Sequence, residues 1–281
     1  MTTQFNSVHI VPKLNAAQDP AILGILDLIM TTAVRLNASV VGKAAVNVDT
    51  LVIAVGGDGT MLEAMRIAAQ ADATAIGVNL GRIGFLTDIS VQQHLTHALA
   101  AAILRLTDTF IEERMLLKTS ISDTLAVNEV SVSQLYADAL ISYRLRIGNV
   151  DAGGHRANGL LISTPTGSTA YSLSVGGALM MPEMDAIQIV PVAPATMTSR
   201  PIIVPSSTTI ELHVWGGEVT VRSDGQILHN NDEVVEEGWK PSKTDPYKLT
   251  IKPFEHKAKV LHFSGWNFFD VLTEKLGWKH E

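Results

Sequence analysis

A short apolar run that leads directly into a glycine-rich turn constrains the fold of this chain more than any other feature. Residues 51–55 are apolar and β-branched, which is typical of a buried parallel strand, and apolar side chains recur at helical spacing from Met61 onward. Glycines leave room for a ligand, and the first N–H groups of a helix attract anions. We therefore predict a phosphate-binding turn between strand and helix, made by Gly56, Gly57, Gly59 and Thr60.

Asp58 is the one charged residue in this turn. A carboxylate repels phosphate, so its presence points to a group that binds the accompanying metal or accepts a proton in catalysis. The turn is neither a P-loop, since no Gly-Lys-Ser/Thr follows, nor a dinucleotide fingerprint, since the third glycine is missing. The alternative is a tight turn in which Asp58 is only a local hydrogen-bond acceptor. Thr60 and Glu63 have the spacing of a capping box, which predicts that the helix begins at Thr60.

The chain changes character near residue 106. Before it, apolar strand-like runs at 8–11, 39–41, 51–55 and 75–78 alternate with helical patterns at 20–36, 61–68 and 94–106, which favours a parallel sheet with crossover helices. After it, short strand-like runs are separated by glycine, proline and asparagine, which is typical of a β-rich domain. We predict an α/β domain at 1–106, a β-rich, sandwich-like domain at 107–255, and an amphipathic tail at 256–281 that packs. The expected strands of the second domain are 111–122, 125–132, 139–147, 187–192, 208–214, 218–223 and 247–251.

Composition and charge narrow the classes of partner. The net charge of -7 gives no general electrostatic reason to bind nucleic acid or an anionic membrane. The absence of cysteine excludes disulfides and thiolate metal sites, and it is compatible with a cytoplasmic protein. The polar first residues lack a signal-peptide pattern, and the longest apolar region, around 95–106, is too short to span a bilayer. We expect a cytoplasmic protein that binds neither nucleic acid nor membrane.

Two further segments carry polar groups suited to a nucleotide. Asn128 and Glu129 follow a strand-like run, and such a pair can bind ribose hydroxyls or help to hold a cation, although most pairs of this kind are ordinary turn or surface residues. The run 159–171, GLLISTPTGSTAY, joins a strand to a turn rich in hydroxyls, and Ser168 or Thr169 can cap the helix expected after it. Its hydroxyls and the ring of Tyr171 can form a nucleotide cradle. The alternative is a capped helix with Tyr171 packed inside.

In this order, the turn at 56–60, the Asn128-Glu129 pair and the run 163–174 resemble the NAD kinase family. Segments 79–86, 200–202 and 224–226 also match. The resemblance implies an α/β domain joined to a β-sandwich-like domain, with the site between them and a C-terminal tail that returns to the first domain. It implies transfer of a phosphoryl group from ATP or polyphosphate to the adenosine-ribose 2′-hydroxyl of NAD, with Mg²⁺ or another divalent metal carried by the nucleotide phosphates. It also implies a homo-oligomer, a dimer or a tetramer.

The resemblance assigns roles by position. Asp58 corresponds to the proton acceptor, and Asn128 and Glu129 correspond to residues that bind the NAD ribose. The remaining residues implied in substrate binding are Gly59, Phe85, Arg156, Asn158, Thr166, Thr169, Ala170, Tyr171, Ser172, Ser174 and Gln226.

Three positions depart from the family pattern. Asn158 occupies the position of the acid in the usual segment Arg-x-Asp-Gly. Ala195 lies where the segment Pro-x-Ala-Pro-His is common, and Ala139 lies where the family often has a basic or histidine side chain. None of the three removes Asp58, so an active enzyme is still expected. Two alternatives remain: a kinase of the same turn type with a lipid or sugar acceptor, and a non-catalytic sensor of NAD or NADP.

Overall fold

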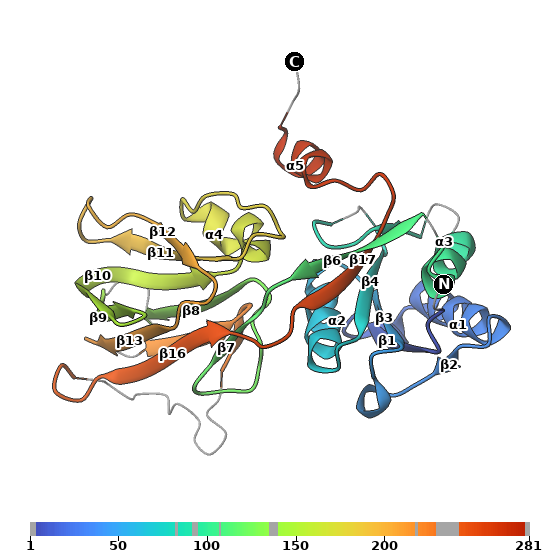
Figure 1. Ribbon diagram of the computed structural model, residues 1–281, viewed down its shortest axis with the longest axis horizontal. Helices are drawn as coiled ribbons and strands as arrows, with labels where there is room; N and C mark the ends of the chain where they lie inside the picture. The colour runs from blue at the N-terminus through green and yellow to red at the C-terminus, as the bar shows by residue number, and fades with distance from the viewer. Residues whose placement is uncertain are drawn as a thin grey trace. The chain divides into compact units, whose positions relative to one another are not determined.

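The chain divides into two compact units, which Figure 1 shows in chain-order colours. The computed structural model describes residues 4–81, 84–91, 95–106, 108–134, 140–216, 219–228 and 242–278. The first unit is Met1–Arg114 with His256–Glu281, and the second is Met115–Glu255. The division after Arg114 lies beyond the expected one at residue 106, because strand β6 (Thr109–Arg114) pairs with strand β17 (Ala258–Phe263) of the first unit.

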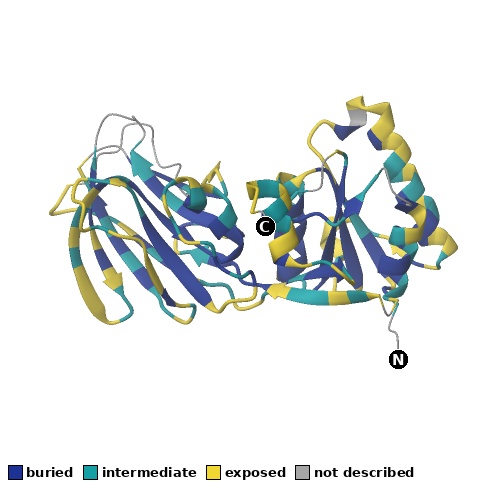
Figure 2. Ribbon diagram, turned by 90° about the horizontal axis from the view of Figure 1, so that it is seen from above, coloured by how far each residue is buried: buried dark blue, intermediate teal, exposed yellow. Residues whose placement is uncertain are grey.

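The first unit is built on a seven-stranded sheet that is mostly parallel, as the alternating pattern predicts. The strand order is β2-β1-β3-β4-β17-β6, with β5 paired to β4; among the described strands of this sheet, the β17–β6 pair is antiparallel and the others are parallel. The central strands β3 and β4 are buried along their whole length (Figure 2). The remaining strand bounds are β1 Ser7–Pro12, β2 Ser39–Val40, β3 Thr50–Val55, β4 Thr74–Asn79 and β5 Ile89–Ser90.

Helices α1, α2 and α3 pack against this sheet. In α1 (Pro20–Arg35), Asp19 caps the first turn by accepting a hydrogen bond from the backbone N–H of Ala21 at 2.9 Å, and Pro20 occupies the first position, where it loses no intrahelical bond. Its buried face, which includes Ile22 and Ile29, joins the core of the unit. The other helices are α2 Asp58–Gln70, α3 Leu95–Leu104 and α5 Phe268–Leu276, with 3-10 turns at Ala16–Gln18 and Lys43–Ala45.

The C-terminal segment returns to the first unit, as expected. Strand β17 lies between β4 and β6, so it completes the sheet (Figure 1). Helix α5 follows it, capped by Asn267, whose side chain accepts from the N–H of Asp270, and ended by Gly277 in the left-handed conformation (φ 69°). The segment is therefore a structural part of the α/β fold.

The second unit is one curled antiparallel sheet of ten strands. The order is β15-β14-β8-β10-β9-β13-β16-β7, with β11 beside β10 and β12 beside β11. The long strand β10 (Val150–Ser163) organises it, because its first half pairs with β9 and its second half with β8, while β11 pairs along the other edge. The strands therefore belong to a single branched sheet rather than to two separate sheets. The other bounds are β7 Leu117–Thr119, β8 Glu129–Gln134, β9 Ile141–Ile147, β11 Ala186–Pro194, β12 Ile202–Pro205, β13 Ile210–Trp215, β14 Val219–Ser223, β15 Gln226–Ile227 and β16 Tyr247–Pro253.

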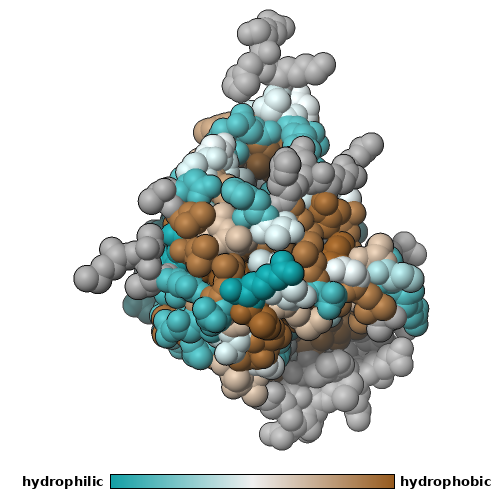
Figure 3. Space-filling view, turned by 90° about the vertical axis from the view of Figure 1, so that its right-hand side faces the viewer, coloured by the Kyte–Doolittle hydropathy of each residue, from teal (hydrophilic) through white to brown (hydrophobic). Residues whose placement is uncertain are grey.

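The surface of the first unit mixes polar and apolar groups. Figure 3 shows brown apolar areas between teal polar ones on the side that carries α1 and α3. Several apolar side chains of α1 are exposed, among them Leu23 and Val34. Within the described ranges, no helix has the length and apolar character needed to cross a membrane.

Candidate active site

The glycine turn joins β3 to α2, as the sequence predicts, but the helix starts earlier. Helix α2 begins at Asp58 with Gly57 as its N-cap, and no side chain caps it. The backbone N–H groups of Thr60 and Met61 both donate to the carbonyl of Gly57, at 3.0 and 3.1 Å. The predicted capping box is therefore wrong. Glu63 instead forms ion pairs with the buried Arg66 at 3.1 Å and with the exposed Lys43 at 3.3 Å.

The turn has the features of an anion site. Gly57 and Gly59 are exposed with open space where a side chain would be, so a ligand can approach the backbone there. A Cβ on Gly56 would lie 2.2 Å from Oγ1 of Thr60, so that position requires glycine. The first N–H groups of a helix lack intrahelical partners, and the helix dipole adds partial positive charge. This end of α2 can therefore bind phosphate oxygens.

The carboxylate of Asp58 is fixed by the segment that follows β4. Its Oδ2 accepts from the backbone N–H of Phe85 and its Oδ1 from that of Leu86, each at 3.0 Å. A Cβ on Gly84 would lie 2.0 Å from Oδ1, so only glycine allows this approach. Asp58 thus accepts two local hydrogen bonds, as the alternative interpretation of the turn expected. Each carboxylate oxygen has a second lone pair, so the half-buried group can still accept a proton.

In the second unit, Asp224 holds the backbone that carries Asn128 and Glu129. Its carboxylate accepts from the N–H groups of Val127 at 2.9 Å, Asn128 at 2.8 Å and Glu129 at 3.0 Å. Asp224 adopts the left-handed conformation (φ 46°), and Gly225 follows it with φ 81°. The sequence analysis missed this anchor; the Asp224-Gly225 turn was its only local signal.

The hydroxyl-rich run clamps the same backbone. The N–H of Thr164 donates to the carbonyl of Asn128 at 2.9 Å, and its Oγ1 donates to the carbonyl of Val127 at 2.6 Å. A Cβ on Gly167 would lie 2.1 Å from the carbonyl oxygen of Asn128, so the two segments touch through backbone. The hydroxyl of Ser168 does not cap a helix. It donates to the carbonyl of Met180 and accepts from the N–H of the same residue. Much of the expected cradle is therefore a scaffold for residues 127–129.

Two buried polar atoms near this scaffold have no hydrogen-bond partner among the described residues. They are Oε2 of Glu129 and Oγ1 of Thr166. Glu129 is only 7% exposed; burial, together with the charge of Asp224, raises the pKa of its carboxyl to about 7. A carboxyl that is partly protonated near neutral pH can both donate and accept a hydrogen bond. Such a group suits the vicinal hydroxyls of a ribose, and a bound ligand would satisfy the unpaired oxygen.

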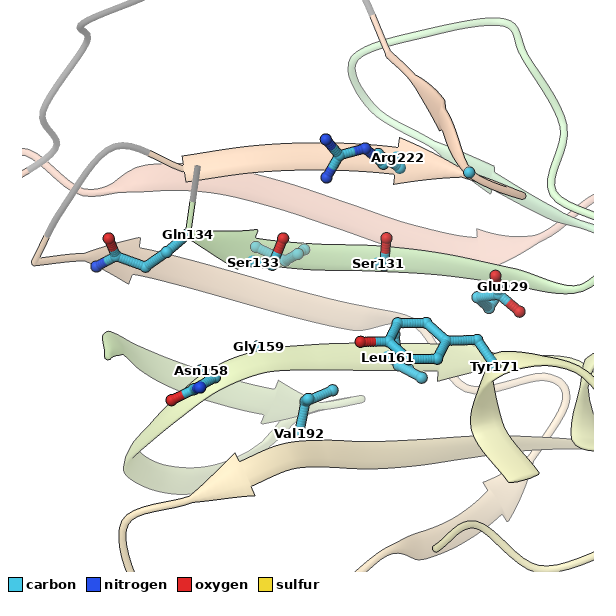
Figure 4. A pocket seen from close by; sticks show the side chains of 12 residues that line it. Glu129, Ser131, Ser133, Gln134, Asn158, Gly159, Leu161, Tyr171, Val192 and Arg222 are labelled. Atoms are coloured by element: carbon cyan, nitrogen blue, oxygen red, sulfur yellow. The ribbon is translucent and has the colours of Figure 1, made fainter. Parts of the chain in front are cut away.

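Glu129 borders a pocket of about 330 Å³ on one face of the sheet. Figure 4 shows Glu129, Ser131 and Ser133 in succession along β8, since alternate residues of a strand share a face. Arg222 reaches the pocket from the neighbouring strand β14, and Tyr171 from the short helix α4 (Tyr171–Ser174). The rest of the lining is Val132, Gln134, Asn158, Gly159, Leu161, Val192 and Gly225.

The other residues assigned by resemblance have varied positions. Asn158 and Tyr171 line the pocket with Glu129, and Tyr171 is 47% exposed rather than packed inside. Ser172 is fully buried and donates to Oε1 of Gln188 at 3.1 Å, so it supports the fold. Thr169 donates to the carbonyl of Thr166 at 3.2 Å in the 3-10 turn Thr166–Thr169, Ala170 is half-buried beside it, and Arg156, Ser174 and Gln226 are exposed. Of the departures, Ala195 donates its N–H to the carbonyl of Arg156, and Ala139 lies outside the described residues.

Comparison with known proteins identifies the family. Residues 27–105 match the model of the ATP-NAD kinase N-terminal domain, and residues 127–235 match that of the ATP-NAD kinase C-terminal domain. The chain is 35% identical to the NAD kinase of Yersinia pestis over 268 residues, 90% of this chain and 83% of that protein. It is 35% identical to the NAD kinase of Erwinia tasmaniensis over 243 residues, 81% of this chain and 76% of that protein.

Solved structures agree at the level of the fold. An NAD kinase from Archaeoglobus fulgidus in complex with ATP has a TM-score of 0.73 at 23% identity and covers 98% of this chain and 100% of its own. Yeast NADH kinase complexed with NADH has a TM-score of 0.76 at 18% identity, over 99% of this chain and 89% of its own. Both domain models and relatives of about one-third identity, matched over most of their length, show that the chain belongs to the NAD kinase family.

Proposed function

We propose that this protein is an NAD kinase that phosphorylates the adenosine-ribose 2′-hydroxyl of NAD to make NADP. The observation that carries the proposal is the fixed carboxylate of Asp58 at the open N-terminus of α2. It occurs in a chain whose curated relatives are named NAD kinase. The pocket beside Glu129 supports the acceptor, because its unpaired carboxyl oxygen and serine hydroxyls suit a sugar.

In the proposed reaction, Asp58 takes the proton of the attacking hydroxyl. A secondary hydroxyl is a poor nucleophile at neutral pH, and a positioned base typically contributes about 10²–10⁴-fold in rate. The bond from the 2′-oxygen to the γ-phosphorus forms, and the bond from that phosphorus to the bridging oxygen of ATP breaks, so ADP leaves. The backbone amides of Phe85 and Leu86 hold the carboxylate in one orientation. The turn at Gly57 and Gly59 would bind donor phosphates, since phosphoryl transfer depends mainly on positioning and charge stabilisation.

The dinucleotide would be held by the scaffold around Asn128 and Glu129. Three amide bonds to Asp224 and the clamp from Thr164 fix this backbone before a ligand arrives, which lowers the entropy lost on binding. The protonatable carboxyl of Glu129 would bind ribose hydroxyls. Tyr171 would offer an aromatic face, and Asn158 an amide that can both donate and accept.

The divalent metal belongs to the donor in this proposal. Among the residues that the structure describes, no group of three or more histidine, aspartate or glutamate side chains is placed to hold a metal ion. We propose that the phosphates of ATP or polyphosphate would hold Mg²⁺ or another divalent ion, which would supply positive charge to offset their own.

Assembly and location extend the proposal. Strand β12 pairs with β11 and has no second partner among the described strands, and its Ile202 and Ile203 are about half exposed. An unpaired edge with exposed apolar side chains supports a homo-oligomer, a dimer or a tetramer, which light scattering during gel filtration can test. The cytoplasmic location and the absence of nucleic-acid and membrane partners remain predictions.

An acceptor panel tests the function. The purified protein, incubated with γ-labelled ATP and Mg²⁺, should label NAD and leave diacylglycerol and hexoses unlabelled. Labelling of a lipid or sugar instead would assign the alternative kinase class. Binding of NAD or NADP without any labelled product would assign the sensor.

A further inference from the structure

A buried histidine in the first unit has two carboxylate partners that the proposed reaction does not use. His262, on β17, has none of its surface exposed. Its Nδ1 lies 2.7 Å from Oδ2 of Asp88, and its Nε2 lies 3.0 Å from Oε2 of Glu112. A neutral imidazole has one N–H and one lone pair, so it can donate to only one carboxylate. The geometry therefore corresponds to an imidazolium that donates from both nitrogens.

The charges around this ring balance only in that form. Arg114, also buried, donates from Nε to Oε2 of Glu112 at 2.8 Å. Asp88, Glu112, Arg114 and a protonated His262 sum to zero, whereas a neutral ring leaves a buried negative charge, which is strongly unfavourable. Burial alone would lower the pKa of His262, but the hydrogen bonds to Asp88 and Glu112 outweigh it and raise that pKa above its usual value.

The positive charge of Arg114 opposes protonation of the ring and lowers the pKa of His262, but the two carboxylates outweigh it. Aromatic side chains also pack against the cluster. Trp266 stacks on the imidazole with a centroid separation of 4.0 Å and an interplanar angle of 20°, and Phe110 lies on it at 5.5 Å. Beyond Asp88, a pocket of about 210 Å³ is lined by His97 and Asp108. The aromatic rings limit access of water to His262, which strengthens its two hydrogen bonds.

Asp88 directly follows the segment, residues 84–87, that holds the carboxylate of Asp58. Phe85 and Leu86 donate their N–H groups to Asp58, as described above. Oγ1 of Thr87 accepts from the N–H of Gly84 at 3.0 Å and from the side chain of Asn79 at 2.9 Å. The segment is thus tied to β4 through Thr87 and to β17 and β6 through Asp88, one residue further on.

We propose that His262 is a positioning residue for the phosphoryl transfer: its imidazolium fixes Asp88 and so keeps the amides of Phe85 and Leu86 against Asp58. This inference rests on the proposed role of Asp58. It gives the returning C-terminal strand a part in the reaction, although His262 touches none of the reacting atoms. Deprotonation of His262 at alkaline pH releases the segment and misplaces the carboxylate.

The first test needs no variant. Nitrogen-15 spectra of the imidazole rings in the wild-type protein at pH 7.5 should show one histidine protonated at both nitrogens, whereas an ordinary histidine is mostly neutral there. The resonance should be missing from the spectrum of the H262Q variant. A neutral tautomer at His262 would overturn the proposal.

The second test compares H262Q with H97Q, which changes an exposed histidine on the same pocket. In H262Q the amides of Phe85 and Leu86 should exchange faster with deuterium, and kcat should fall by about ten- to a hundredfold with a smaller change in KM, as for a catalytic group displaced by about 1 Å. In the wild type, kcat should decline at alkaline pH as His262 loses its proton, and this decline should be absent from H262Q. H97Q should leave all three unchanged.

Unchanged exchange at Phe85 and Leu86 with unchanged kcat in a folded H262Q would reduce the cluster to a structural clamp. If H262Q does not fold, D88N, in which a neutral amide replaces the carboxylate that pairs with the imidazolium, should show weaker effects of the same kind on exchange and kcat, because charge-assisted hydrogen bonds are about twice as strong as neutral ones; wild-type values in D88N would overturn the proposal. The exchange result is independent of Asp58 chemistry. Failure of the base role would therefore appear as turnover retained in D58N, while faster exchange in H262Q would still show the mechanical link.

Discussion

Replacement of Glu129 by glutamine should make the stability of this protein less sensitive to pH. The carboxyl of Glu129 is 7% exposed, and burial followed by the charge of Asp224 raises its pKa from the usual 4.5 to about 7. The folded state therefore holds this proton more tightly than the unfolded state does. The stabilisation from the protonated form is complete below pH 4.5 and is lost as the pH rises through 7.

The magnitude follows from the size of this rise. Each pKa unit corresponds to about 1.4 kcal/mol, so ionisation of Glu129 should destabilise the folded state by about 3 kcal/mol between pH 4.5 and pH 8. Glutamine has nearly the same shape and does not ionise. Glu129→Gln should therefore differ from the wild type by less than about 1 kcal/mol at pH 5 and exceed its free energy of unfolding by up to about 3 kcal/mol at pH 8.

Urea unfolding of both proteins from pH 5 to pH 9, followed by circular dichroism, measures this difference. Glu183→Gln, at an exposed position of the same unit, is the matched control and should show no such trend. The reasoning is refuted if the difference between Glu129→Gln and the wild type is constant with pH, or if it grows toward acid.

Three further predictions concern the reacting groups. Asp58→Asn should lower kcat by about 10²–10⁴-fold while NAD affinity stays close to wild type, because the proton acceptor is removed; the amide can accept from only one of the N–H groups of Phe85 and Leu86, so the melting temperature should fall as well. Half of the wild-type kcat would exclude the base role. Gly84→Ala should lower kcat, because the new methyl group would lie 2.0 Å from Oδ1 of Asp58 and must displace it, and calorimetry should show unchanged NAD affinity. Asn158→Asp should strengthen NAD binding, since charge-assisted hydrogen bonds are about twice as strong as neutral ones; an inactive wild type that this change activates would contradict the account.

The parts of the fold that depend on local pattern were predictable. Residues 51–70 carry a complete strand, turn and helix signal within one segment, so β3, the glycine turn and α2 are confirmed. The start of α2 was misplaced at Thr60, because the open backbone at Gly57 serves as N-cap without any side chain. The change to a β-rich domain was also visible, but the pairing of β10 with three neighbours was not, since strand neighbours are set by contacts far apart in sequence.

The sequence predicted candidate site residues only where the residue type itself indicates a chemical role. Asp58 and Glu129 stand out as carboxylates beside turns. Asp224 lies 95 residues from Glu129 and accepts hydrogen bonds from backbone amides. Every residue type except proline has such an amide, so the sequence does not indicate this contact. His262 and Asp88 are separated by 174 residues for the same reason. Thr164 was placed in a nucleotide cradle because its hydroxyl suits a ligand, and Ser172 was assigned to the substrate site by resemblance. A hydroxyl suits a scaffold equally well, and only the fold shows which groups the two residues bond.

The most direct measurement is the conversion of NAD to NADP by the purified protein. The wild type and Asp58→Asn are incubated with NAD, ATP and Mg²⁺, and the product is counted by a dehydrogenase that accepts only NADP. The account predicts steady NADP formation by the wild type, with the phosphate on the adenosine-ribose 2′-oxygen by phosphorus NMR, and a loss of about 10²-fold or more in the variant. Absence of NADP from the wild-type reaction, or equal rates for the two proteins, would contradict it.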